Sequence, residues 1–191
     1  TAAALTGFGF KVFPIKAGSK FPPLWTEWPR KAALVPSGAD FPDNCNVGIH
    51  CEGLVVVDVD PRSGGDESLI AFDMDDATPL PRTLMSHTPS GGKHLFYRLP
   101  EGHPGVPNKP LAKGIDIKST RGYVVGAGSK TAGDYRWADP SAPIAAAPGW
   151  LVERLGMVAP KSAAAGQPVP DADEMAVRRA LDWIQSRPVG D

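Results

Sequence analysis

The chain has 191 residues, 42% of them hydrophobic, and a formal net charge of −1 at pH 7. This length and composition are enough for a domain with a sizeable core, which excludes a disordered chain. The balanced charge excludes binding of nucleic acid through overall basicity, and no apolar run approaches the ~18 residues of a membrane span. Two cysteines and the lack of a secretory signal predict a reducing compartment, the cytoplasm.

Hydrophobic periodicity predicts more strands than helices. Helices are predicted up to Gly7, over residues 66–75 and over residues 150–155. Strands are predicted over residues 10–15, 47–50, 54–59, 83–87, 94–98, 115–119, 123–127 and 135–137.

We expect the main domain to cover residues 1–157, because the composition changes after it. Residues 158–172 are rich in proline and alanine, which is typical of a linker. Residues 173–191 carry a helical pattern of apolar residues, and we expect a C-terminal helix that opens a further helical segment.

Two acidic residues end the buried run of residues 54–57. Asp58 and Asp60 are two positions apart, so in a strand their side chains point to the same face, about 6.5–7 Å apart. Neighbouring carboxylates repel one another unless a cation lies between them, and Mg²⁺ or Mn²⁺ is the usual cation for oxygen ligands. The alternative is a strand end whose acids only face water.

The segment SGGKH, residues 90–94, precedes a predicted strand. Its glycines, Gly91 and Gly92, let the backbone approach an anion, and Ser90, Lys93 and His94 offer donors to triphosphate oxygens. A Gly-Gly turn that opens a β-hairpin explains the glycines equally well.

A third segment, GIDIKS, begins at residue 114. Asp116 lies between two isoleucines and points away from them in a strand, where it is a candidate third metal ligand with Lys118 beside it for phosphate charge. An isolated aspartate on a solvent-facing strand is the alternative. Acids are concentrated in residues 40–76 and bases in residues 93–136, as expected for a metal-binding wall opposite a phosphate-binding wall.

The order of these motifs resembles the bifunctional primase-polymerase (Prim-Pol) N-terminal domain of the archaeo-eukaryotic primase superfamily, found in replication proteins of phages, plasmids and other mobile elements. The motifs that carry the resemblance are residues 9–14 (GFKVFP), 46–49 (NVGI), 57–60 (VDVD), 90–94 (SGGKH), 114–117 (GIDI), 123–129 (YVVGAGS) and 133–137 (GDYRW). Between residues 25 and 46 the chain departs from the family pattern, so no role is carried over there.

The resemblance implies an α+β fold with an RRM-like mixed or antiparallel sheet core, a second small α/β subdomain and an archaeo-eukaryotic primase-like cleft between them. It implies that Asp58, Asp60 and Asp116 are catalytic and bind two divalent ions, Mg²⁺ or Mn²⁺. Lys16 and Lys20 correspond to early basic residues that contact template or nucleotide. The nucleotide-binding residues that the resemblance implies are Ser90, Gly91, Gly92, Lys93, His94, Lys118 and Ser129.

The implied function is that of a template-directed DNA primase and polymerase, which makes and extends primers on single-stranded DNA from dNTPs or NTPs. Such a domain is expected without a membrane span and fused to a helicase or another replication domain, in the host cytoplasm if phage-encoded. A replication-initiator module that binds nucleotide or single-stranded DNA without catalysis remains open. A metal-dependent phosphodiesterase also remains open, because the same acids could activate water.

Overall fold

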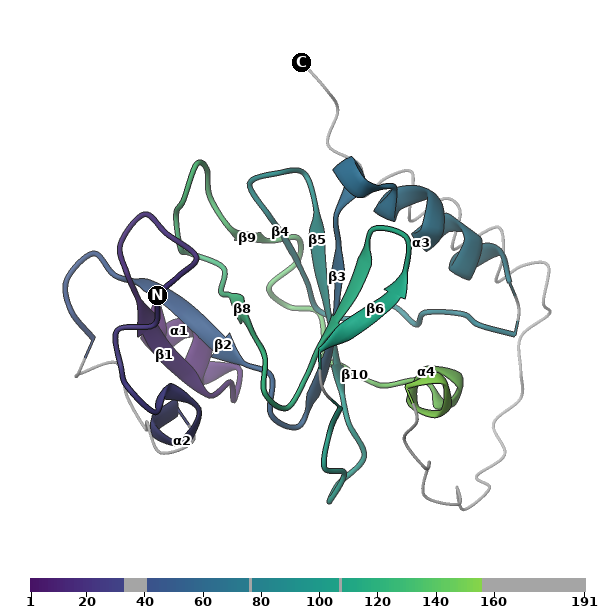
Figure 1. The fold of residues 1–191 in the computed structure, drawn as a ribbon, viewed down its shortest axis with the longest axis horizontal. Coiled ribbons are helices and arrows are strands. Elements are labelled where there is room, and N and C mark those ends of the chain that lie inside the picture. Colours follow the sequence, from purple (N-terminus) through teal and green to yellow (C-terminus); the bar gives the residue numbers. More distant parts are fainter. Residues whose placement is uncertain (33–40, 76, 107, 156–191) are drawn as a thin grey trace.

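The computed structural model describes residues 1–32, 41–75, 77–106 and 108–155. Its strands form two sheets that lie next to one another (Figure 1). The smaller sheet is antiparallel, and its strands in spatial order are β1 (Val12–Ile15), β2 (Asn46–His50) and β8 (Tyr123–Val125). The predicted linker, residues 158–172, and the predicted C-terminal helix, residues 173–191, lie outside the described residues.

The larger sheet has the spatial order β6-β7-β3-β5-β4-β9, and all neighbours on this path are antiparallel. Its strands are β3 (Leu54–Val59), β4 (Met85–His87), β5 (Lys93–Arg98), β6 (Lys109–Ala112), β7 (Ile115–Lys118) and β9 (Arg136–Trp137). A short strand, β10 (Ala145–Ala146), pairs parallel to β5. The prediction of a mixed α+β fold with mainly antiparallel sheets is therefore confirmed.

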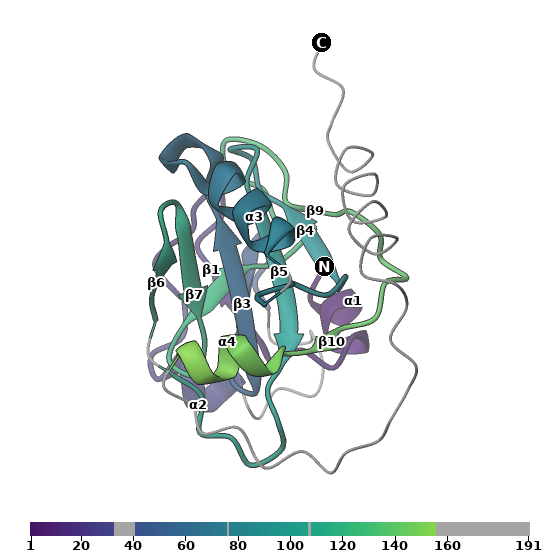
Figure 2. The same ribbon diagram turned by 90° about the vertical axis from the view of Figure 1, so that its right-hand side faces the viewer.

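The helices are short and lie at the edges and on the outer face of the sheets. They are α1 (Ala2–Gly7), α2 (Trp28–Ala32), α3 (Gly65–Met74), α4 (Gly149–Arg154) and a 3-10 turn, η2 (Pro61–Ser63). Figure 2 shows α3 and α4 on one face of the larger sheet. Helices α1, α3 and α4 lie within one residue of their predicted ends, whereas α2, β6 and β10 were not predicted.

Strand β3 has both faces buried along most of its length, which explains its continuous apolar run. Val55, Val57 and Val59 pack in the cluster that contains the apolar residues of α3 and α4. Leu54 and Val56 point to the other face and pack in the cluster that contains α1. Each buried valine stabilises the fold by roughly 1.5–3 kcal/mol. The next residues on this second face are the two aspartates of the D-x-D motif, at the point where the apolar cover ends.

Two glycines join the end of β3 to its neighbours. The amide of Asp60 donates to the carbonyl of Gly114 at 2.8 Å, and the amide of Gly65 donates to the carbonyl of Asp60 at 2.9 Å. A Cβ on Gly65 would lie 2.5 Å from the Gly114 oxygen, so the two backbones are in direct contact. Gly114 also has a φ of +67°, which L side chains rarely adopt. This packing fixes the backbone of Asp60 beside the turn that leads into β7.

Candidate functional site

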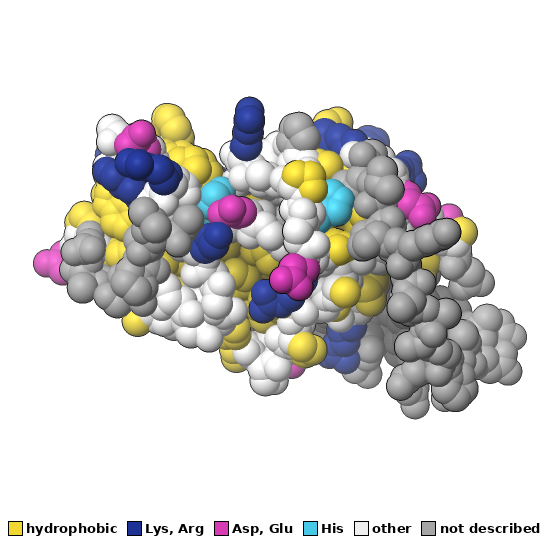
Figure 3. Space-filling model, turned by 90° about the horizontal axis from the view of Figure 1, so that it is seen from below, with side chains coloured by type: hydrophobic (Ala, Val, Ile, Leu, Met, Phe, Trp, Pro, Cys, Tyr) yellow, Lys and Arg dark blue, Asp and Glu magenta, His cyan; other side chains and the backbone are white. Residues whose placement is uncertain are grey.

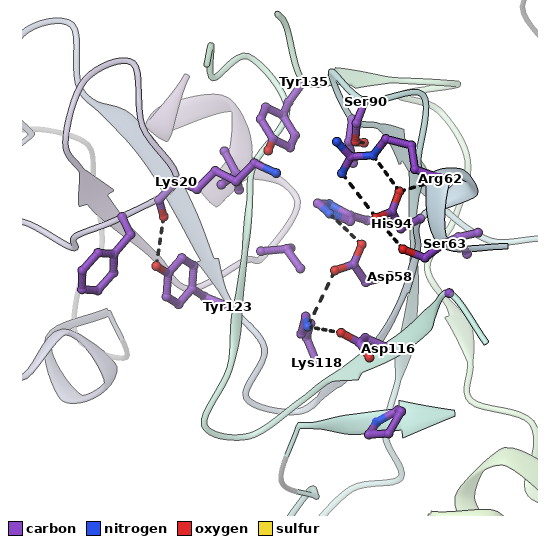
Figure 4. A pocket seen from close by; sticks show the side chains of 18 of the residues that line it. Lys20, Asp58, Arg62, Ser63, Ser90, His94, Asp116, Lys118, Tyr123 and Tyr135 are labelled. Atoms are coloured by element: carbon purple, nitrogen blue, oxygen red, sulfur yellow. Dashed lines mark hydrogen bonds and ion pairs between the residues drawn. The ribbon is translucent and has the colours of Figure 1, made fainter. Parts of the chain in front are cut away.

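Three of the predicted site residues form one row across the larger sheet. Asp58 on β3 is the register partner of Asp116 on β7 and of His94 on β5. Register partners on neighbouring strands project from the same face of a sheet. The row therefore brings together side chains that are far apart in the sequence, and Figure 4 shows all three directed into one cavity.

The Lys118 ammonium lies between the two acids of this row. Its Nζ is 3.0 Å from Asp116 Oδ2 and 3.8 Å from Asp58 Oδ2. Burial raises the pKa of the Asp58 carboxyl, the positive charge of Lys118 opposes this rise, and the negative charge of Asp116 adds to it. The position between Asp58 and Asp116 is thus one that favours a positive charge.

His94 is buried at the other end of the row and is neutral at physiological pH. Its Nε2 is 3.6 Å from Asp58 Oδ1, and its Nδ1 is 3.4 Å from the Ser86 hydroxyl oxygen. Burial lowers the pKa of His94 to about 3, and the charges of Lys20 and Lys118 add to this effect. A neutral imidazole carries one N–H donor and one acceptor nitrogen, so His94 can donate one hydrogen bond into the cavity.

Asp60 follows β3 and is held by Arg62, two residues further along the chain. Asp60 Oδ1 accepts from the Arg62 amide and from Arg62 Nε, both at 3.1 Å, and Oδ2 accepts from Nη2 at 3.3 Å. The Ser63 hydroxyl also donates to Oδ2, at 3.3 Å. These donors, the Arg62 side chain first, hold the pKa of Asp60 below its usual range.

The row lines a cavity of about 540 Å³ between the two sheets, a volume within the common range for small-ligand sites. The wall opposite the acids comes from the smaller sheet and from the loop after β1. In that wall the Tyr123 hydroxyl donates to the backbone carbonyl of Lys20 at 3.0 Å. The Lys20 side chain reaches into the cavity, as Figure 4 shows.

Ser90 also lines the cavity, and the two glycines after it shape the turn into β5. The Ser90 hydroxyl is 3.1 Å from that of Thr88. Gly91 has a φ of +80°, and a Cβ on Gly92 would collide with the carbonyl oxygen of Val59. Neither glycine lines the cavity, so the hairpin explanation of the Gly-Gly pair accounts for their positions.

Two predicted nucleotide-binding side chains are not brought to the cavity. Lys93 projects from the opposite face of β5, where its buried ammonium lies 3.6 Å from Asp66 Oδ1 at the start of α3. The Ser129 hydroxyl is buried and accepts from the amide of Val47 at 2.9 Å. Both side chains support the fold in this structure.

Arg62, Tyr123 and Tyr135 are among the cavity-lining residues that were not singled out from the sequence. Arg62 had a visible signal, since it is the only base within the acidic stretch of residues 40–76 and lies two residues after the acid pair. The two tyrosines lie in motifs that were noted, but which tyrosines face the cavity depends on how the two sheets pack.

The acids of the cavity offer oxygen ligands of the kind that a hard divalent cation takes. Within the residues that the structure describes, no group of three or more His, Cys, Asp or Glu side chains lies close enough together to hold a metal ion. The donors are the carboxylate pair of Asp58 and Asp116, already bridged by the Lys118 cation, with Asp60 nearby. Mg²⁺ commonly takes one or two carboxylates together with substrate phosphates, which matches this donor set.

In the face drawn in Figure 3, basic side chains are dispersed and interspersed with acidic ones. None of the described helices is long and apolar enough to cross a membrane.

Comparison with known proteins identifies the family of this chain. A search of curated proteins finds no match. A family model described as bifunctional DNA primase/polymerase, N-terminal, matches residues 2–150 of the 191-residue chain. That family acts on DNA with nucleotides and carries out nucleotidyl transfer in DNA replication. The match covers the whole row of site residues and most of the chain, and this protein therefore belongs to the Prim-Pol family.

Proposed function

We propose that the cavity binds a nucleoside triphosphate and a primer end, and that the protein makes and extends primers on single-stranded DNA. The observation that carries this proposal is the row of Asp116, Asp58 and His94 in one cavity of a Prim-Pol domain. Transfer of a nucleotide needs negative charge on the enzyme to hold cations, and donors to hold phosphate oxygens. The row supplies both within one face of one sheet.

Asp58, Asp60 and Asp116 would hold two divalent ions, Mg²⁺ or Mn²⁺. Such ions, when bound, activate the primer 3′ hydroxyl and stabilise the leaving pyrophosphate oxygen. The chain itself would position the triphosphate: neutral His94 and Ser90 donate hydrogen bonds to phosphate oxygens, and Lys118 neutralises charge. Because these groups lie on strands and tight turns, they need little reorganisation before the reaction.

We also propose a fold subclass, a biological setting and a compartment for this protein. The two sheets with the cavity between them are consistent with an RRM-like core and a primase-like cleft. We place the protein in replication of a phage or another mobile element, in the cytoplasm, with a helicase or other replication domain in the same polypeptide. The two cysteines, Cys45 and Cys51, are free thiols, which is consistent with a reducing compartment.

Primer extension tests the proposal. A labelled primer on single-stranded template is incubated with dNTPs or NTPs and Mg²⁺ or Mn²⁺, and products are resolved on a gel. We expect Asp58→Asn to reduce incorporation by about 1,000-fold, or roughly 4 kcal/mol of transition-state stabilisation. Asp134→Asn is the matched control, because Asp134 is an acid outside the cavity that, like Asp58, contacts a basic side chain, here Arg136.

Each alternative gives a different result in this assay. Binding of nucleotide or DNA by the wild type without incorporation would favour a non-catalytic replication-initiator module. Cleavage of the labelled strand without extension would favour a phosphodiesterase. Full activity of Asp58→Asn would refute the role given to the row.

A further inference from the structure

Every carboxylate predicted to bind metal already contacts a basic side chain of the same chain. Lys118 contacts both Asp58 and Asp116, and Arg62 contacts Asp60. A third cation, Lys20, reaches into the same cavity. The basic side chains that line the cavity therefore balance its acids in number: Asp58, Asp60 and Asp116 face Lys20, Arg62 and Lys118.

This balance of acidic and basic side chains weakens the affinity of the cavity for a divalent ion that binds alone. An ion that binds alone must displace or lie beside a positive charge at each carboxylate, which weakens its attraction to the acids. A triphosphate changes this, because its oxygens offer new partners both to the ion and to the basic side chains. The carboxylates are then released for the ion by the arrival of the nucleotide.

Arg62 is the basic residue best suited to such an exchange. Its side chain is 67% exposed and is held mainly by Asp60, through Nε–Oδ1 at 3.1 Å and Nη2–Oδ2 at 3.3 Å. This two-point contact with a carboxylate is one that a guanidinium can also make with a phosphate. Figure 4 shows Arg62 directed into the cavity on the side where Ser90 and Ser63 lie.

We propose that Arg62 is a triphosphate-binding residue that exchanges Asp60 for the nucleotide, so that nucleotide and divalent ion bind with positive cooperativity. The inference rests on the proposed function, since it takes a nucleoside triphosphate as the ligand of the cavity. Cooperativity of this kind is reciprocal: the nucleotide raises the affinity for the ion by the same factor as the ion raises the affinity for the nucleotide.

The test compares Arg62→Gln with Arg136→Gln. Arg136 is a matched control, because it is likewise exposed and pairs with an aspartate two residues away, Asp134, but does not line the cavity. Binding of Mn²⁺ is followed by electron paramagnetic resonance, first alone and then with a non-hydrolysable dNTP analogue. Thermal melting of each variant confirms that it folds.

Removal of Arg62 should move the two affinities in opposite directions. Without nucleotide, Arg62→Gln should bind Mn²⁺ roughly two- to fivefold more tightly, since one exposed ion-pair partner of Asp60 is lost. With Mn²⁺ present, it should bind the analogue about tenfold more weakly, since a charged donor to phosphate is lost. Arg136→Gln should match the wild type in both measurements, and Arg62→Lys should keep part of the analogue affinity.

An unchanged or weakened Mn²⁺ affinity of Arg62→Gln would overturn the exchange, and unchanged analogue binding would overturn the phosphate contact. If the wild type extends primers and Arg62→Gln binds both ligands as the wild type does, only the inference about Arg62 fails. If the wild type binds no analogue with Mn²⁺, the proposed function and the inference fail together.

Discussion

Substitution of Gly92 by alanine tests whether the turn before β5 positions the acidic row. A Cβ on Gly92 would collide with the backbone carbonyl of Val59, lie 3.0 Å from Thr88 Oγ1 and lie 3.4 Å from Pro61 Cδ. Val59 is the residue between the two acids of the D-x-D motif. Its carbonyl belongs to the backbone and cannot rotate away, so either β5 or the end of β3 has to move.

The size of the effect follows from these contacts. Non-bonded heavy atoms prefer separations of about 3.5–4.0 Å, so relief of the collision requires a shift of roughly 1 Å. Overpacking of this kind costs about 1–3 kcal/mol of unfolding free energy, which lowers the melting temperature of a domain this size by roughly 2–12 °C. A misplacement of about 1 Å at the row should reduce primer extension by about 100-fold.

Two measurements check this prediction, thermal melting and primer extension at a temperature well below the melting transition. Gly149→Ala is the matched control, because a Cβ there meets no atom within 4 Å and its φ is not in the left-handed region. The control should melt at or slightly above the wild-type temperature, by the usual gain of about 0.4–1 kcal/mol. A Gly92→Ala protein with wild-type melting and wild-type extension would refute the close approach and its role.

Further predictions concern groups outside the row. Lys93→Met should lower the unfolding free energy by about 1–2 kcal/mol, because Asp66 loses its ammonium partner, yet leave the KM for nucleotide unchanged in primer extension; a raised KM would show that Lys93 reaches the nucleotide. Burial lowers the pKa of His50, so the unfolded state gains its proton more readily than the folded state as the pH falls through about 6.5. Stability to urea should therefore decrease from pH 7 to pH 5, and less so in His50→Gln; equal decreases would contradict this. Cys51 is buried, and burial raises its thiol pKa, so a thiol-reactive dye should label only Cys45 until urea is added; rapid labelling of both in the native protein would count against the core position of Cys51.

Most of the central sheet could be predicted because its strands follow simple rules. The apolar run of β3 and the isoleucines of β7 are patterns that periodicity detects well. Strand β6 was missed because Pro110 removes a backbone donor and reads as a loop, although a proline is tolerated on an edge strand such as this one. Strand β10 was missed because it is two residues long, too short for any periodic pattern, whereas β9 lies within the strand predicted over residues 135–137.

The structure separates the predicted site residues by the direction of their side chains, not by the motif to which they belong. The segment SGGKH was interpreted as a unit, but in a strand successive side chains point to opposite faces. His94 therefore faces the cavity, whereas Lys93 faces α3. Ser129 was taken from the resemblance, and its hydroxyl is used to hold β2. Arg62 is the only base in the acidic stretch of residues 40–76, but it was overlooked because the sequence does not show that it lines a cavity.

Register explains why the site depends on the whole sheet rather than on any one motif. Asp58 meets His94 and Asp116 only because β3 is paired with β5 and β7 in one particular alignment. A slip of one residue between β3 and β5 would bring Lys93 to the cavity side and send His94 toward the helices. Gly92 sits against Val59 where that pairing begins, and Gly114 sits against Gly65 beside the start of β7. The glycines thus act on the chemistry through alignment, which is why a single methyl group at Gly92 is expected to reduce both stability and primer extension.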